Sequence, residues 1–403
     1  MTDSANGFLS LNTDLTFQSP EKIQDGSINY VSFKPQSIGA YGPNTTVDFR
    51  LRSTNEFVVL ERSYMKFRLT ETGAAGAATG GTILSSMGAQ AVISQVQDTV
   101  SGLQLPVIKN YNLQQSLKLN TDTTTRKAVT TVTEAFGGGI SGTSTFASKT
   151  FCIPVPTSLA SASKIIPLAV LNGGWNITLQ LEQYARVFTN GNPANSYSVD
   201  QLEIVCCMLK PDDKYLSELS AAMSRQGSLK IPLQLVKNIT ATLAATNTQS
   251  VRIPSGYLSS LNSITSVIRQ VANVGTGTNT TAHDTFVTNT SALQEYYFMV
   301  NSQRYPKNKA IVCQDPENLL QLLSSFNSKY SELTPFTSTN AFTHFSFESN
   351  GGMASGIAIN DGYVNIETTF ASTPAQGDVL DCFLEYSAVL VIDMNSVDLI
   401  IDV

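Results

Sequence analysis

The stretch DCFLEYSAVLVIDMNSVDLIIDV, residues 381–403, is a strong β-run that ends the second half of the chain. A similar run, SVDQLEIVCCML at residues 198–209, ends the first half. Short apolar-alternating segments, long Gly/Ser/Thr loops and one brief helical stretch precede each run. One strand-rich plan therefore runs twice, and two tandem β-barrels without visible catalytic residues indicate a building block rather than an enzyme.

Period-2 alternation supports the strand assignments. In YMKFRL, residues 64–69, apolar side chains alternate with polar or charged ones, as in a strand with one buried face. Other strands expected in the first half are 28–35, 45–52, 151–159, 165–171 and 175–184. Those expected in the second half are 228–243, one or two within 251–271, 296–312, 342–349 and 362–370. Residues 87–102 fit either a strand or a helix.

The strongest helix signal is PDDKYLSELSAAMSRQG, residues 211–227. Pro211 suits the first turn, Asp212 and Asp213 complement the dipole there, and Gly227 can end the helix. Residues 110–120 could hold a short helix, and residues 317–330 (ENLLQLLSSFNSKY) fit a helix with a leucine-rich face. The glycine-rich segments at 73–82 and 137–145 and the Gly/Thr/Asn-rich segment at 273–292 are expected to be loops.

These signals divide the chain into four parts. A length of 403 residues suffices for two domains of about 200 residues each. We expect an N-terminal arm at 1–27, a first jelly roll at 28–210, a linker helix at 211–227 and a second jelly roll at 228–403. The fold class is therefore all-β, as two tandem eight-stranded jelly rolls with short connecting helices.

Composition excludes several classes of function. Only 14% of residues are charged, against roughly 25% in a typical soluble domain, so weak repulsion opposes self-association. A net charge of −6 and the lack of a Lys/Arg cluster argue against packaging nucleic acid with a basic surface. We also expect no signal peptide, and no run approaches the ~20 apolar residues that cross a bilayer.

Residues for metal or nucleophilic chemistry are sparse. The two histidines, His283 and His344, cannot supply the several imidazoles of a cupin-like metal site. No GxSxG elbow supports a Ser–His–Asp triad. The five cysteines have no regular spacing and are interpreted as small apolar residues. We therefore expect no catalytic residue, no metal and no cofactor.

Acidic and aromatic residues leave two alternatives open. A glycosidase-like carboxylate pair would have to come from Asp361, Glu367, Asp378 and Asp381, which are close in sequence but better explained as solvated loop and strand-end residues. Trp175, the single tryptophan, is either a core residue, which we favour, or an exposed platform for a sugar.

Several phrases together resemble the double jelly-roll major capsid proteins of the hexon-like lineage, of the polinton-like virus type. STNEFVVLERSYMKFRLTE (53–71) is similar to an early pair of strands, and IIPLAVLNGGWNITLQLE (165–182) to late strands of the first barrel. EYYFMVNSQRYPKNKAI (295–311) and the ending at 381–402 resemble strands of the second barrel. The resemblance covers residues from about 30 to 403, although the segment 342–360 is richer in Gly, Ser and Asn than the pattern.

This resemblance implies a major capsid protein that forms pseudo-hexameric trimers, since two barrels per chain give six lobes. Such trimers would tile an icosahedral shell around a double-stranded DNA genome, in a virion assembled inside the host cell. The implied partners are the chain itself, penton and minor capsid proteins and, in some members, an internal membrane, with little direct contact to nucleic acid. The alternative is a two-barrel carbohydrate- or receptor-binding protein.

Overall fold

The computed structural model describes residues 27–73, 83–84, 88–115, 148–161, 165–189, 195–269, 293–307, 309–313, 342–347, 356–375, 377–393 and 397–400. The expected arm up to residue 26, nearly all of the three expected loops, the expected helix at 317–330 and His283 lie outside these residues.

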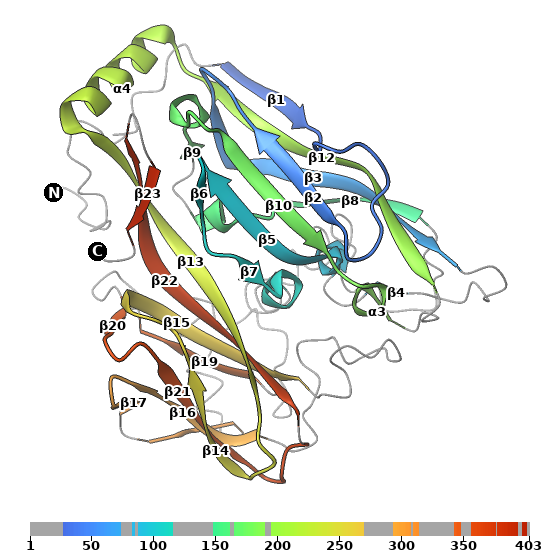
Figure 1. Cartoon of the computed structure of the whole chain (residues 1–403), viewed down its shortest axis with the longest axis vertical. Helices are drawn as coiled ribbons and strands as arrows, with labels where there is room; N and C mark the ends of the chain where they lie inside the picture. Colours follow the sequence, from blue (N-terminus) through green and yellow to red (C-terminus); the bar gives the residue numbers. More distant parts are fainter. Residues whose placement is uncertain are drawn as a thin grey trace, which may run out of the picture.

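Two facing sheets are built from the first half of the chain (Figure 1). The first has the order β1-β12-β3-β8, with bounds Ser27–Phe33, Ser196–Lys210, Phe57–Thr72 and Ser148–Pro154, and β9 (Ile165–Ile166) pairs with β3. The second has the order β2-β10-β5-β6, with bounds Thr46–Leu51, Trp175–Leu181, Ile93–Val100 and Leu103–Gln104, and β7 (Ile108–Lys109) pairs with β5. A short pair joins β4 (Ile83–Leu84) to β11 (Phe188–Thr189).

The second half builds two more sheets. One has the order β13-β22-β15-β19, with bounds Ser228–Thr242, Val379–Asp393, Leu258–Arg269 and Phe342–Ser346; β20 (Ile357–Ile359) pairs with β15, and β23 (Val397–Ile400) with β22. The other has the order β14-β21-β16-β17, with bounds Thr248–Ile253, Val364–Phe370, Leu293–Val300 and Gln303–Tyr305, and β18 (Ile311–Val312) pairs with β16.

The two halves share one topology. In each, the first strand pairs with the last long strand and the second strand with the one before it: β1 with β12 and β2 with β10, then β13 with β22 and β14 with β21. This antiparallel order is that of a jelly roll. The repeat extends to single residues, because Arg50 faces Asn176 in the first half as Arg252 faces Asn365 in the second. The expected all-β double jelly roll is confirmed.

Helix α4 (Asp213–Gln226) follows the first half, where a helix was expected. The Asp212 carboxylate accepts a hydrogen bond from the Tyr215 backbone N–H at 2.7 Å and caps the helix. Pro211 therefore precedes the cap and does not lie in the first turn. Gly227 ends the helix with φ 82°, a conformation that glycine adopts at little cost. The division of the chain into domains stays a prediction.

Two other expectations need correction or completion. The strand expected at 165–171 is only the two residues of β9, because Pro167 cannot donate to a ladder and a 3₁₀ turn, η4 (Leu168–Val170), follows. The ambiguous residues 87–102 contain both a 3₁₀ helix, η1 (Gly88–Val92), and strand β5. Other short helices among the described residues are η3 (Ser158–Ser161) and α3 (Tyr184–Val187), and residues 111–115 are helical.

The core of each half lies between its two sheets. Exposed and buried side chains alternate strictly along β2, and β14 has the same alternation at every residue. Trp175 is fully buried, which confirms it as a core residue rather than an exposed sugar platform. Of the adjacent cysteines on β12, Cys206 joins the core cluster and Cys207 is also buried, because both faces of the strand are covered at that point.

Candidate functional site at the junction of the two sandwiches

Part of the outer face of the sheet β13-β22-β15-β19 is buried, although it points away from the core of its own sandwich. Asp381 and Phe383 on β22 are 0% and 2% exposed, and their neighbour Val267 on β15 is 1% exposed. Elements of the first half contact this sheet, since β7 and η3 both pack on β13. The two sandwiches therefore meet along a buried junction, beside which β13 and β22 run (Figure 1).

Asp381 is the polar centre of this junction. Its Oδ1 accepts hydrogen bonds from Asn110 Nδ2 at 2.9 Å and Thr240 Oγ1 at 2.8 Å, and its Oδ2 is paired with Arg269 Nε. Asn110 follows β7 in the first half and has φ 49°, a left-handed conformation that asparagine tolerates. It also donates to Asn238 Oδ1 at 3.2 Å. One side chain of the first sandwich thus hydrogen-bonds a buried ion pair of the second.

A second buried carboxylate, Asp98, organises the first sandwich near the junction. Its oxygens accept from Trp175 Nε1 at 2.8 Å, Thr157 Oγ1 at 3.0 Å, the Ser158 backbone N–H at 2.7 Å and the Ser158 hydroxyl. Burial raises the pKa of Asp98, and the four hydrogen bonds oppose that rise. Because Ser158 begins η3, which packs on β13, Asp98 holds a contact element of the junction in place.

The four carboxylates considered for acid–base chemistry do not share one environment. Asp378 and Asp381 are 1% and 0% exposed, so their expected solvation is wrong, because both sheet faces are covered where β22 begins. Asp361 is exposed, and Glu367 on β21 accepts a hydrogen bond from Ser250 Oγ at 2.5 Å. The structure gives Asp381 a structural role in the ion pair.

His344 also lies on the buried outer face of the second sandwich. Its Nδ1 is 2.8 Å from Thr265 Oγ1, and burial lowers the pKa of His344 to about 3, so the ring is neutral at physiological pH. Across the part of the chain that the structure describes, no three His, Cys, Asp or Glu side chains form a group able to hold a metal ion. The same part contains no helix long and apolar enough to span a membrane.

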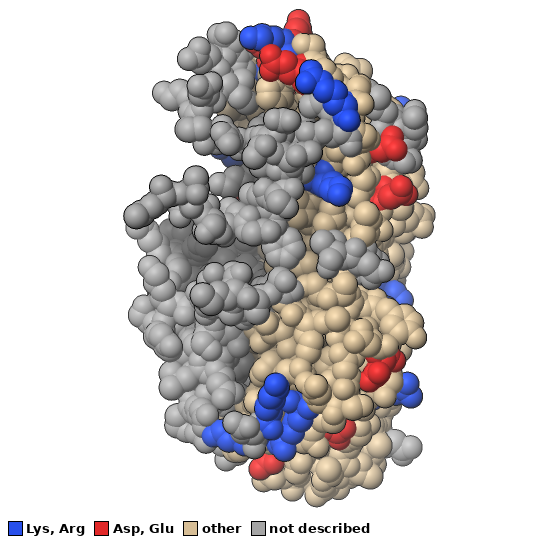
Figure 2. All heavy atoms as spheres, turned by 90° about the vertical axis from the view of Figure 1, so that its left-hand side faces the viewer, with Lys and Arg blue, Asp and Glu red and all other residues tan. Residues whose placement is uncertain are grey.

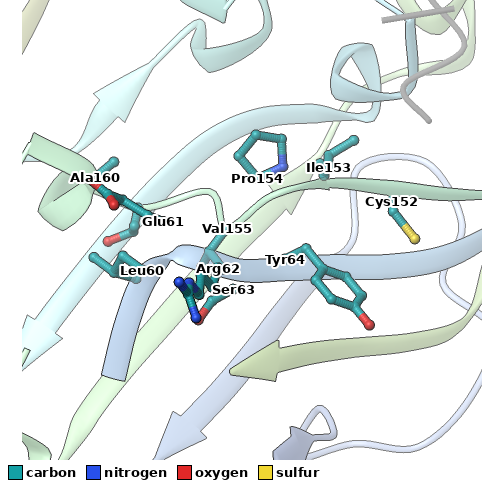
Figure 3. A pocket seen from close by; sticks show the side chains of 11 residues that line it. Leu60, Glu61, Arg62, Ser63, Tyr64, Cys152, Ile153, Pro154, Val155 and Ala160 are labelled. Carbon is teal, nitrogen blue, oxygen red and sulfur yellow. The ribbon is translucent and has the colours of Figure 1, made fainter. Parts of the chain in front are cut away.

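A groove of about 470 Å³ opens on the outer face of the first sandwich, where β3 passes from its pairing with β8 to its pairing with β9 (Figure 3). Tyr64 and Cys152 lie at one end of this groove and Leu60 and Ala160 at the other. Its lining is Leu60, Glu61, Arg62, Ser63, Tyr64, Cys152, Ile153, Pro154, Val155, Thr157 and Ala160. This set contains neither a histidine nor a second carboxylate, so it lacks the two carboxylates of a glycosidase-like pair.

The sequence analysis correctly predicted Trp175 as a core residue but missed the residues that form the contacts at and near the junction. Asp98 had a local signal, because it shares the inward face of β5 with Val96 and Val100, where a charged side chain needs buried partners. Asn110 and Arg269 had none, since they meet Asp381 across 271 and 112 residues of sequence.

The sequence matches no protein-family model, and no curated protein is similar to it. Solved structures do match. The Faustovirus major capsid protein aligns with a TM-score of 0.68 at 11% identity, covering 94% of this chain and 92% of that one. The PBCV-1 virus capsid model gives 0.65 at 13%, covering 93% and 96%. The mavirus major capsid protein gives 0.55 at 11%, covering 93% and 90%. The chain has the double jelly-roll fold of these viral major capsid proteins.

Proposed function

We propose that this chain is the major capsid protein of a virus. Three copies form a pseudo-hexameric trimer, and trimers tile an icosahedral shell around a double-stranded DNA genome. The observation that carries this proposal is the match of both jelly rolls, in order, over more than 90% of this chain and of the Faustovirus capsid protein. Under this proposal the chain is a structural protein of the virion and not an enzyme.

The buried junction supports this role. A capsid subunit transmits load between neighbours, and relative rotation of the two sandwiches would break the hydrogen bond from Asn110 of the first to the buried Asp381 of the second. Two rigidly joined lobes of one topology per chain suit a ring of three chains with six lobes. Penton and minor capsid proteins and an internal membrane are further proposed partners.

The test is the solution mass of the purified full chain by light scattering, with negative-stain imaging of the same sample. A trimer of three times 43.4 kDa, about 130 kDa, with a six-lobed outline, or larger shells, is the expected result. A monomer at all concentrations would contradict the proposal. It would favour the alternative of a two-barrel carbohydrate- or receptor-binding protein, which glycan arrays would then test.

A further inference from the structure

The two sandwiches offer a comparison within one chain, because the outer faces of the sheets β2-β10-β5-β6 and β14-β21-β16-β17 occupy equivalent positions. Across the first sheet, one row of outward side chains is Arg50, Asn176, Thr99 and Gln104. The equivalent row across the second sheet is Arg252, Asn365, Met299 and Arg304. The register is the same, but a threonine and a glutamine are replaced by methionine and arginine.

The next outward position on β5 and β16 also changes from a plain polar residue to a residue type common in interfaces. Gln97, which faces Thr178 in the first sheet, is replaced by Tyr297, which faces Glu367 in the second. Fold and register cannot explain this difference, because both sandwiches share them. We call the surface formed by Arg252, Tyr257, Tyr297, Met299, Arg304 and Tyr363 the Arg–Tyr face.

Both arginines of the Arg–Tyr face stack on tyrosine rings. The guanidinium of Arg252 lies 3.9 Å from the ring centroid of Tyr363, and that of Arg304 lies 4.2 Å from the centroid of Tyr297. Such stacking fixes the plane of a guanidinium while its edge remains free to donate. Neither arginine forms a salt bridge with any acidic residue that the structure describes.

Tyr257 extends the face at its edge. Its side chain lies beside Gly362, next to the stacked Tyr363, and it is 75% exposed, the most exposed aromatic side chain among the described residues. Figure 2 shows one group of Lys and Arg side chains toward the lower end of the molecule, the end where Figure 1 places β14, β16 and β17, and further ones toward the upper end.

Tyr, Arg and Met are the residue types enriched in the centres of protein–protein interfaces, and Tyr and Arg dominate their hot spots. The chain has 31 acidic and 25 basic residues, so a second copy is a source of carboxylates for the two guanidinium groups. We infer that the Arg–Tyr face is an interface with a second copy of this chain, in which Arg252 and Arg304 bind carboxylates of the neighbour.

This inference rests on the proposed self-assembly. In a ring of three chains the contact is heterologous, so the Arg–Tyr face meets a different, acidic surface of the next copy and not itself. The equivalent face of the first sandwich is plainly polar and is not expected to bind a neighbouring copy. Its Arg50, at the position equivalent to Arg252, therefore provides a matched control.

The test compares the full-length wild type with Arg252→Gln, Arg304→Gln and Tyr257→Ser, and with the control Arg50→Gln. Mass is measured by light scattering over a dilution series at two salt concentrations, and folding by thermal denaturation. We expect each arginine variant to weaken self-association about thirtyfold, the loss of a 2 kcal/mol hot spot, and Arg50→Gln to have no effect. Tyr257→Ser, a change at an exposed side chain, keeps the test valid if an arginine variant unfolds.

The outcomes separate the two proposals. If the wild type self-associates and the folded variants self-associate equally well, the interface is refuted and the capsid proposal still stands. A wild type that stays monomeric would overturn both. If the variants assemble normally but lose binding to heparin, the face is a site for an anionic glycan and the interface is likewise refuted. Weaker assembly of the variants, with stronger salt dependence in the wild type, supports the inference.

Discussion

Asp98→Asn tests whether the buried carboxylate of the first sandwich stabilises the fold through its hydrogen bonds. The substitution keeps the shape of the side chain and removes its charge. Four donors converge on Asp98: the indole N–H of Trp175, the backbone N–H of Ser158, and the hydroxyls of Thr157 and Ser158. The hydroxyls can rotate to accept from an amide, whereas the two N–H groups can only donate.

The magnitude follows from that difference. An asparagine at this position has one acceptor oxygen, so it satisfies either the Trp175 or the Ser158 N–H and leaves the other buried and unpaired. An unpaired buried donor costs about 1–3 kcal/mol, which is the expected loss in the free energy of unfolding. Asp98→Ala, which leaves both N–H groups unpaired, should cost about twice that, ~2–6 kcal/mol, before any cavity is counted.

The assay is urea denaturation at one protein concentration, followed by the fluorescence of Trp175, the only tryptophan, and by circular dichroism. Burial raises the pKa of Asp98 in the folded state, so this residue's contribution to stability is greatest in acid and falls as pH rises through that raised pKa. The wild type's advantage over Asp98→Asn should therefore narrow with rising pH. Equal stability of the two proteins in acid and at neutral pH would refute the reasoning.

Three further predictions concern other buried side chains. Trp175→Ala should lose roughly 3–5 kcal/mol in the free energy of unfolding, measured by urea denaturation followed by circular dichroism, because it empties a fully buried site. Arg269→Met should lose about 3–5 kcal/mol, since it strands the Asp381 carboxylate, and a double-mutant cycle with Asn110→Ala should show coupling across the junction. Burial lowers the pKa of His344 to about 3, below the value near 6.5 of an unfolded histidine, so its neutral form contributes stability above pH 6.5 that is lost as pH falls toward 3. His344→Gln should lessen this acid sensitivity in thermal melts across that range.

Local signals predicted the elements well where one face of a strand is buried. The alternation at residues 64–69 lies within β3, and the Asp212 and Gly227 signals bound α4 within one residue. These signals succeed because capping and period-2 burial depend on neighbours in sequence. The expected strand at 165–171 was wrong for a local reason too, since Pro167 removes a donor.

The junction could not be predicted because its chemistry is made by packing between distant segments. Buried residues succeed one another from Leu380 to Leu384, so period-2 alternation gives no sign of which face meets the core and which meets the other sandwich. The sequence alone therefore led to the interpretation of Asp381 as a solvated strand-end residue. Only the structure brings Asn110 to it, from a turn in the other half of the chain.

The repeated plan makes the differences between the halves informative. Asp98 faces Ile177 in the first sandwich, and at the equivalent position of the second sandwich Phe298 faces Ile366. The same inward position therefore holds a hydrogen-bonded carboxylate in one sandwich and an aromatic ring in the other. Asp98 holds η3 in place through Ser158, and η3 packs on β13 of the second sandwich. Six chemically identical lobes in a trimer could pair in several registers, whereas lobes of one shape with different faces favour a single closed arrangement. The departures from the repeat at Asp98 and on the Arg–Tyr face are therefore where specificity of assembly would reside.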